Sequence, residues 1–486
     1  MTQRRLSEAT LAQTRPGTAR PVYDRGACRI GWVHFGPGAF HRAHQAYYAD
    51  RLLGRDPRWA ISAVSLRSAA VRDALAPQDY LYCLAELAEQ PQLRVIGALR
   101  EILVAPADCG AVFARLVAPD TRFVTLTVTE KGYCLGGDGR LDFAHPDIAH
   151  DLRSGARPRT VIGFLAEGLR RRRARGHTPF VVASCDNLPD NGPTLRAAVA
   201  AFTARTDPGL ARWIDSEVAF PRTMVDSITP ATDAALIERV ARASGLQDEW
   251  PVQREPFIQW VIEDLPQVRL ADWASVGVTL AADVSRYDRA KLRVVNGTHS
   301  TLAYLGLLRG RTTVAEAMAD APLQRLLERL LREDIAPSLQ GGGALEVRGY
   351  IDATLERLRN PSVRHQLAQI AWDGSKKLPV RLLAAMAEAL AAGRPLERLA
   401  LPIAAWMRFV VARTRAGGPL TDPQAERLLA IGRFCTDEAE RDVARFLTLG
   451  ELFAPPVAAA PAFVRALVNA YRGLGASGSL AEFEDA

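Results

Sequence analysis

The amino-acid sequence changes character near Val284, and this change constrains the fold more than any other feature. Before that point, short apolar runs typical of β-strands alternate with segments of helical periodicity. From Tyr287 to about Leu474, helical patterns rich in alanine, leucine and arginine follow one another. Alternating strands and helices are typical of a parallel sheet covered by helices. The sequence therefore predicts an α/β protein with an α/β domain at 1–284 and a mostly α-helical domain at 285–486.

A strand, a glycine turn and a helix follow the N-terminal leader. Residues 29–35 predict a short buried strand, 36–38 read Gly-Pro-Gly, and 39–53 have helical periodicity. Glycines let the backbone approach a phosphate, and a helix N-terminus offers free N–H groups and the positive end of a dipole. The spacing is Gly-x-Gly-x-x-His, so His41 stands where a dinucleotide-binding fingerprint has its third glycine. The motif alone does not establish a dinucleotide site.

The second predicted strand, 59–66, ends in a basic segment. An NAD-preferring site usually has an acidic residue there to hold the ribose hydroxyls. This sequence has Arg67 and Arg72 instead, and no acidic residue before Asp73. Since an arginine can pair with a 2′-phosphate, the sequence leaves both NAD and NADP open as cofactors.

Polar residues follow two later predicted strands. The strand at 122–129 runs into Glu130, and the strand at 180–184 runs into Asp186 and Asn187. Ligands of open α/β sheets sit beyond the carboxyl ends of the strands. Ordinary turn and helix-cap chemistry is the alternative explanation for such residues.

Residues 291–299 read Lys-Leu-Arg-Val-Val-Asn-Gly-Thr-His and predict a helix. At roughly 100° per residue, Lys291, Asn296 and His299 share one face of that helix. Polar groups on an apolar face cost free energy unless they are paired or used, so a buried network and a functional site both remain open. Only four of the 61 lysine and arginine residues are lysines. Lysine can lose its proton and act as a base, whereas arginine cannot.

The bulk properties exclude several classes of protein. The net charge of +7 is scattered, and its one dense run, 170–175, ends a predicted helix without interleaved aromatics, which argues against nucleic-acid binding. No apolar run approaches the length of a membrane span. The six cysteines form no Cys-x-x-Cys pair, which favours a reducing, cytoplasmic setting. His34, His41 and His44 lack neighbouring cysteines or paired carboxylates, so we expect no metal site.

Several motifs, in order and over nearly the whole chain, resemble the polyol-specific long-chain dehydrogenases. This family includes mannitol 2-dehydrogenase and D-mannonate oxidoreductase (fructuronate reductase). The motifs are Gly36-Pro37-Gly38-Ala39-Phe40-His41-Arg42-Ala43-His44-Gln45, Thr127-Val128-Thr129-Glu130, Ser184-Cys185-Asp186-Asn187, Met224-Val225-Asp226, Glu255-Pro256-Phe257, the Lys-x-Arg-x-x-Asn-x-x-His pattern of 291–299, and Asp373-Gly374-Ser375 with Lys377. The resemblance implies a Rossmann-type NAD(P)-binding domain at 1–284, a helical substrate and catalytic domain at 285–486, and no catalytic metal.

The resemblance also implies roles for individual residues. Lys291 would be the general base that removes the hydroxyl proton. Asn187 and Asn296 would hold the developing alkoxide. His299 would orient the substrate, and Asp288 would take part in proton exit.

The substrate pocket and the cofactor site follow from the same resemblance. Asp226, in a segment (220–226) that reads as a loop, would line the pocket with Arg364 and Lys377. The implied cofactor-binding residues, which lie in the glycine turn, the helix after it and the next strand ends, are Phe35, Gly36, Gly38, Ala39, Phe40, Arg42, Arg67, Thr129 and Glu130.

The substrate is expected to be a small polyol or sugar acid. A sugar acid needs a cation for its carboxylate, which Arg364 or Lys377 could supply; a solvated charge on a helix face is the alternative for Arg364. Residues 130–134, 364–365 and 369–379 resemble the mannonate/fructuronate branch more closely. We therefore favour D-mannonate and D-fructuronate over D-mannitol and D-fructose or another polyol such as arabinitol. The sequence leaves a monomer and a homodimer open.

Overall fold

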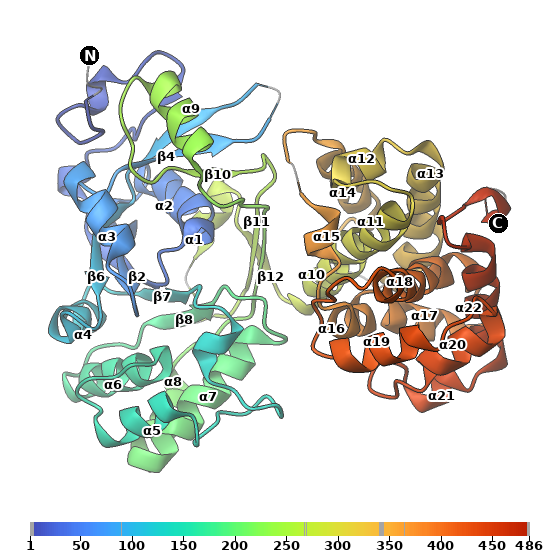
Figure 1. Cartoon of the computed structure of the whole chain (residues 1–486). Coiled ribbons are helices and arrows are strands. Elements are labelled where there is room, and N and C mark those ends of the chain that lie inside the picture. Colours follow the sequence, from blue (N-terminus) through green and yellow to red (C-terminus); the bar gives the residue numbers. More distant parts are fainter. Residues whose placement is uncertain are drawn as a thin grey trace. The chain divides into compact units, whose positions relative to one another are not determined.

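The computed structural model describes residues 4–88, 90–266, 268, 270–339, 345–363 and 365–483. The chain forms two compact units, residues 1–285 and 286–486, whose helices and strands are labelled in Figure 1. The first unit is α/β and the second is helical, which confirms the predicted fold class.

The first unit contains a five-stranded sheet in which every neighbouring pair is parallel. Its order is β6-β3-β2-β7-β8. The bounds are β2 Ile30–Phe35, β3 Ala60–Ser65, β6 Leu99–Val104, β7 Phe123–Leu126 and β8 Val181–Ser184. Numbered along the chain, the strands lie in the order 3-2-1-4-5, which is the Rossmann order.

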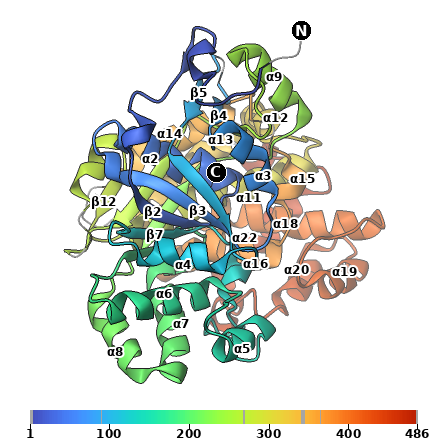
Figure 2. The ribbon, with the colours of Figure 1, turned by 90° about the vertical axis from the view of Figure 1, so that its left-hand side faces the viewer.

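Helices cover both faces of this sheet. Trp32 packs on the face covered by α2 (Gln45–Leu53), whereas Val33 and Phe35 pack on the face covered by α4 (Cys109–Val117) and α6 (Val161–Ala174). Figure 2 shows β2, β3 and β7 side by side, with α4 and α6 below them. Burial on both faces explains why the strands read as continuous apolar runs. The other helices of this unit are α1 Ala39–Ala43, α3 Ala70–Leu75, α5 Pro146–Arg153, α7 Asn191–Thr206, α8 Pro208–Glu217 and α9 Ala234–Ser244.

The single helix predicted at 39–53 is wrong, because the structure divides it into α1 and α2 at His44. The backbone of His44 leaves the helical region, with φ −116° and ψ −85°. Its Nε2 lies 2.9 Å from the carbonyl oxygen of Gln259. No proline or glycine marks the break in the sequence, and His44 is distinguished by contacts with distant residues such as Gln259 and Trp260.

Two smaller sheets complete the first unit. One has the order β12-β11-β9 and the other β1-β5-β4-β10. Their bounds are β1 Thr18–Ala19, β4 Tyr82–Glu86, β5 Leu93–Ile96, β9 Thr223–Asp226, β10 Val252–Arg254, β11 Gln259–Glu263 and β12 Thr279–Ala281. The predicted loop at 220–226 therefore contains a strand, β9, which pairs antiparallel to β11. The strand is recognisable only from this pairing, which joins residues far apart in the sequence.

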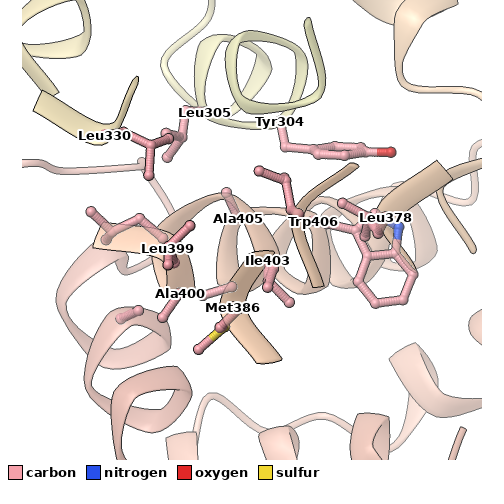
Figure 3. Close-up of a cluster of buried hydrophobic side chains, with 14 of the residues drawn as sticks. Tyr304, Leu305, Leu330, Leu378, Met386, Leu399, Ala400, Ile403, Ala405 and Trp406 are labelled. Atoms are coloured by element: carbon pink, nitrogen blue, oxygen red, sulfur yellow. The ribbon is translucent and has the colours of Figure 1, made fainter. Parts of the chain in front are cut away.

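The second unit is built from helices around one apolar core. α18 packs against α11, α19 and α22. Figure 3 shows Tyr304 and Leu305 of α11 above Ile403, Ala405 and Trp406 of α18. No helix in the described part of the chain is long and apolar enough to cross a membrane. The helices are α10 Ser285–Ala290, which begins at the border of the units, α11 Gly297–Leu308, α12 Val314–Met318, α13 Ala321–Arg329, α14 Val347–Arg359, α15 Leu367–Ile370, α16 Gly374–Leu378, α17 Ala384–Ala391, α18 Glu397–Arg415, α19 Ala425–Arg433, α20 Ala439–Leu447, α21 Pro455–Ala458 and α22 Pro461–Leu474.

Three π-helical turns interrupt these helices within the described residues. They are Lys291–Asn296 between α10 and α11, Leu330–Ile335 after α13, and Pro379–Leu383 between α16 and α17. The first and third turns pack against each other. A π-turn bonds each residue to the fifth one along, and such turns occur frequently at functional sites. The helix predicted at 291–299 is therefore confirmed, but its uniform α-helical spacing is wrong.

Candidate functional site

The glycine turn follows β2 at the point where the order of the main sheet reverses. Gly36 has φ +97°, and a Cβ atom there would lie 2.1 Å from the carbonyl oxygen of Thr127, which follows β7. Only glycine fits this close approach. Gly38 caps the N-terminus of α1, and a Cβ atom there would meet nothing within 4 Å. In open α/β sheets, ligands bind at such a reversal point, so the turn borders the expected crevice.

A stacked histidine pair supports this turn. The rings of His34 and His41 lie 3.4 Å apart at an interplanar angle of 11°. Nδ1 of His34 lies 2.6 Å from Oγ1 of Thr125, and Nε2 lies 2.8 Å from Oγ1 of Thr127. Burial lowers the pKa of His34 to about 3 and the pKa of His41 well below its ordinary value, so both rings are neutral. The stack occupies the place where the third glycine of the fingerprint usually allows helix and strand to approach.

Asp186 joins the loops that follow β7 and β8. Its Oδ2 accepts hydrogen bonds from the Val128 amide at 3.0 Å and the Tyr133 hydroxyl at 2.7 Å. Its Oδ1 accepts from the Thr129 amide at 2.9 Å. Thr129 has φ +65°, which is unusual for a β-branched residue. The sequence indicated only that Asp186 lies beyond a strand end, with ordinary turn chemistry as the alternative, and did not predict this network.

An open hollow of about 360 Å³ lies beside this network. It is lined by Thr129, Glu130, Lys131, Asp186 and Asn187. The structure thus brings the predicted catalytic Asn187 together with two of the predicted cofactor residues.

The remaining predicted cofactor residues near the turn differ in exposure. Phe35 is fully buried in the core. Arg42 is 1% exposed, and its Nη1 donates to the carbonyl oxygen of Trp250 at 2.6 Å. Ala39 and Phe40 begin α1 and are half-buried. Phe35 and Arg42 therefore support the turn from inside the unit, whereas Gly38, Ala39 and Phe40 have access to solvent.

Arg67 is exposed after β3. The neighbouring Arg72 is engaged by Asp73, whose Oδ1 accepts from Nε at 2.9 Å and from Nη2 at 2.7 Å. No carboxylate in the described part of the chain forms an ion pair with Arg67. Of the two arginines that follow β3, Arg67 is therefore the one whose guanidinium is available to bind a ligand.

In the second unit, Lys291 and Asn296 are the first and last residues of a π-turn, and both are half-buried. His299 follows in α11 and is 8% exposed. Asp288 lies in α10 and is half-buried. The structure therefore places all four predicted residues on one continuous helical segment.

The surroundings of His299 are basic. Its ring meets the ring of His365 edge to face, with centroids 5.3 Å apart. Burial, and then the nearby His365, Arg381, Arg357 and Lys377, hold the pKa of His299 well below its ordinary value. The imidazole is therefore neutral, and its Nε2 has no hydrogen-bond partner among the described residues.

Lys377 lies at the end of α16, close to the core. A Cβ atom at Gly374 would lie 2.5 Å from Nε1 of Trp406 and 2.6 Å from the hydroxyl of Tyr304, both labelled in Figure 3. Glycine thus lets α16 begin directly against the core. Nζ of Lys377 donates to the carbonyl oxygen of Ile370 at 3.3 Å, and burial lowers its pKa.

Sequence reasoning missed Arg381. This residue lies in the π-turn after α16, and its Nη1 donates to the carbonyl oxygen of Asn296 at 3.2 Å and to Oγ of Ser300 at 3.1 Å. Burial lowers its pKa to about 10. Because most basic residues of this chain are arginines, no single one stands out in the sequence.

The other predicted substrate residues are Asp226 and Arg364. Asp226 ends β9 and is 7% exposed. Arg364 lies outside the described residues. No cluster of three or more histidine, cysteine, aspartate or glutamate side chains in the described ranges is arranged to hold a metal ion.

Comparison with protein families gives two matches that together cover most of the chain. The mannitol dehydrogenase Rossmann domain matches residues 30–273, and the mannitol dehydrogenase C-terminal domain matches residues 283–474.

Individual relatives agree with this assignment. The D-mannonate oxidoreductase of Escherichia coli is 38% identical over 474 residues, which cover 96% of this chain and 97% of that protein. The polyol:NADP oxidoreductase of Gluconobacter oxydans is 37% identical over 420 residues, 85% of this chain and 87% of that protein. The structure of Pseudomonas fluorescens mannitol 2-dehydrogenase with NAD and D-mannitol matches with a TM-score of 0.80 at 37% identity, covering 97% of this chain and 96% of that one. The predicted resemblance is confirmed: this chain belongs to the mannitol dehydrogenase family of oxidoreductases.

Proposed function

We propose that this protein is an NAD(P)-dependent oxidoreductase that transfers hydride reversibly between a secondary alcohol of a sugar acid and the corresponding ketone. D-mannonate and D-fructuronate are the favoured pair. The observation that carries this choice is the basic environment of His299, which contains Lys377, Arg381 and Arg357. D-mannitol and D-fructose, or another polyol such as arabinitol, are the alternative, since relatives of similar identity are named polyol:NADP oxidoreductase and mannitol 2-dehydrogenase.

The glycine turn supports the cofactor assignment. Gly36 leaves no room for a side chain, and Gly38 leaves open space at the start of α1. Backbone and helix N-terminus can therefore approach a pyrophosphate. When bound, the nicotinamide accepts or supplies the hydride. The proposed contacts are Gly36, Gly38, Ala39, Phe40, Arg67, Thr129 and Glu130, with Phe35 and Arg42 supporting them.

The chain's own residues would handle the proton and the charge on oxygen. Lys291 takes the proton of the substrate hydroxyl, and Asp288 passes it toward solvent. The amides of Asn187 and Asn296 donate to the developing alkoxide, and such donors are typically worth ~3 kcal/mol each. His299, being neutral, can hydrogen-bond a substrate hydroxyl through Nε2.

The pocket charges support a carboxylate substrate. Asp226, Arg364 and Lys377 are the proposed lining residues. A carboxylate near several cations gains charge-assisted hydrogen bonds, which are stronger than those of a neutral hydroxyl. A neutral polyol would form no ion pair with these cations.

A panel of substrates and cofactors tests this proposal. D-mannonate, D-mannitol and D-arabinitol are each oxidised with NAD⁺ and with NADP⁺, and the reduced nicotinamide is followed by absorbance. We expect the highest kcat/KM with D-mannonate. A higher value with D-mannitol would favour the alternative, and no turnover of any alcohol would refute the proposed function.

Arg67 provides a test of cofactor choice. If its guanidinium pairs with the 2′-phosphate, Arg67→Ala should raise KM for NADP⁺ roughly 10-fold, because a charged hydrogen bond is lost, and leave KM for NAD⁺ unchanged. Arg72→Ala is the matched control, since Arg72 is engaged by Asp73. Strict preference of the unaltered enzyme for NAD⁺ would refute this role of Arg67.

A further inference from the structure

Arg381 braces the helix that carries the proposed catalytic residues. Its Nη1 donates to the carbonyl oxygen of Asn296 and to Oγ of Ser300. Asn296 closes one π-turn, and Arg381 lies in another that packs against it. The guanidinium is therefore fixed relative to Asn296.

The opposite edge of this guanidinium has no protein partner. Both hydrogen bonds leave from Nη1, so Nε and Nη2 lack an acceptor among the described residues. No carboxylate in the described ranges forms an ion pair with Arg381, although the side chain is half-buried and its pKa is lowered by burial. Burying a charge without a counter-ion costs free energy, so the binding of an anion at this guanidinium would be favourable.

Lys377 does not supply the same recognition. Its ammonium is a point charge that already donates to the carbonyl oxygen of Ile370. A guanidinium presents two parallel N–H groups that match the two oxygens of a carboxylate. Lys377 adds positive charge, but its ammonium group does not match the planar geometry of a carboxylate.

We propose that Nε and Nη2 of Arg381 bind the carboxylate of the sugar-acid substrate, while the hydrogen bond from Nη1 holds the guanidinium in a fixed position relative to Asn296. Arg381 is then the residue that distinguishes an aldonate from a polyol. This inference rests on the proposed function and names the group that sets its substrate class.

Two substitutions of Arg381 test the proposal against D-mannonate and D-mannitol. Arg381→Met removes the charge, and we expect it to raise KM for D-mannonate roughly 100-fold through the loss of two charged hydrogen bonds. Arg381→Lys keeps the positive charge but loses the two parallel N–H groups, and we expect it to raise KM for D-mannonate roughly 10-fold. Arg381→Met also removes the Nη1 bonds to Asn296 and Ser300, so kcat/KM for D-mannitol should fall as well, but by a factor roughly 10-fold smaller than for D-mannonate, since a neutral polyol makes no ion pair. Lys376→Met, at an exposed position in α16, is the matched control and should leave both substrates unaffected.

The outcomes separate this inference from the proposed function. If the unaltered enzyme oxidises D-mannonate and Arg381→Met leaves its KM unchanged, the inference fails and the function stands. An equal loss of kcat/KM for both substrates would show that Arg381 only braces Asn296, which also overturns the inference. Oxidation of D-mannitol without D-mannonate would overturn the inference and the sugar-acid assignment together. Thermal unfolding of each variant shows whether it folds, and Arg381→Lys keeps the test decisive if Arg381→Met does not.

Discussion

The two units hold their candidate functional residues in different ways. In the first unit, Thr129 and Asn187 lie in loops beyond parallel strands, Glu130 begins a short 3-10 helix directly after Thr129, and the Asp186 carboxylate fixes the loop that contains Thr129. In the second unit, Lys291 lies in a π-turn within a helical segment, where backbone hydrogen bonds set its position.

This difference has a consequence for substitutions. A loop depends on a few side-chain bonds, so the loss of one can displace several residues at once. A helix is held in place by its backbone hydrogen bonds and by packing against the core. The loss of one partly exposed side chain therefore removes the chemical group of that side chain and leaves the backbone in place. Substitution of Lys291 in the second unit should thus affect turnover alone, and substitution of Asp186 in the first should couple stability with cofactor binding.

Lys291→Ala is expected to have the largest effect. Loss of a general base should reduce kcat roughly 10³-fold. Alanine has the highest helix propensity and Lys291 is half-buried, so the unfolding midpoint should hardly change. Affinity for the reduced cofactor, measured by fluorescence titration, should also stay the same.

Two further variants sharpen this test. Lys291→Arg keeps a positive charge that cannot act as a base, so it should be as inactive as the alanine variant. Arg289→Ala, at an exposed position in the preceding helix, is the control and should retain activity. Turnover by Lys291→Ala equal to that of the unaltered enzyme would refute the assigned mechanism.

The sequence predicted the parts of the fold that depend on local pattern. Strands such as β2 and β7 are buried on both faces, so they read as apolar runs that periodicity detects. It missed features that depend on distant contacts. The break at His44 coincides with a contact to Gln259, and β9 is recognisable only from its pairing with β11.

The same distinction applies to the candidate site. Lys291 stands out because lysine is rare in this chain, whereas Arg381 is hidden by the abundance of arginine. The position of Arg381 next to Asn296 depends on the packing of two π-turns, which are 85 residues apart in the sequence at this contact. No spacing rule connects residues so far apart. The network around Asp186 was missed for the same reason, because Val128 and Tyr133 belong to an earlier loop.

Asp186→Asn is expected to have a smaller effect on turnover but a broader one on the molecule. The carboxylate accepts bonds from two amides and a hydroxyl, and an asparagine NH₂ group cannot accept. The loop with Thr129 should therefore loosen, which costs about 1–3 kcal/mol of unfolding free energy and raises KM for the cofactor. Denaturant unfolding and initial rates measure the two quantities.

The pH dependence of this variant gives a second measurement. Burial raises the pKa of Asp186 above its value in the unfolded chain, so the folded protein binds the proton more tightly. Its contribution to stability is then fully present below the unfolded pKa and is lost as the pH rises through the folded pKa. The stability difference between the unaltered protein and Asp186→Asn should thus widen as the pH falls from neutral into the acid range. Asp190→Asn is the control, because Asp190 is exposed and pairs with Arg222 at the surface. If Asp186→Asn left stability and cofactor KM unchanged, the loops of the first unit would not depend on this carboxylate, and the contrast between the units would fail.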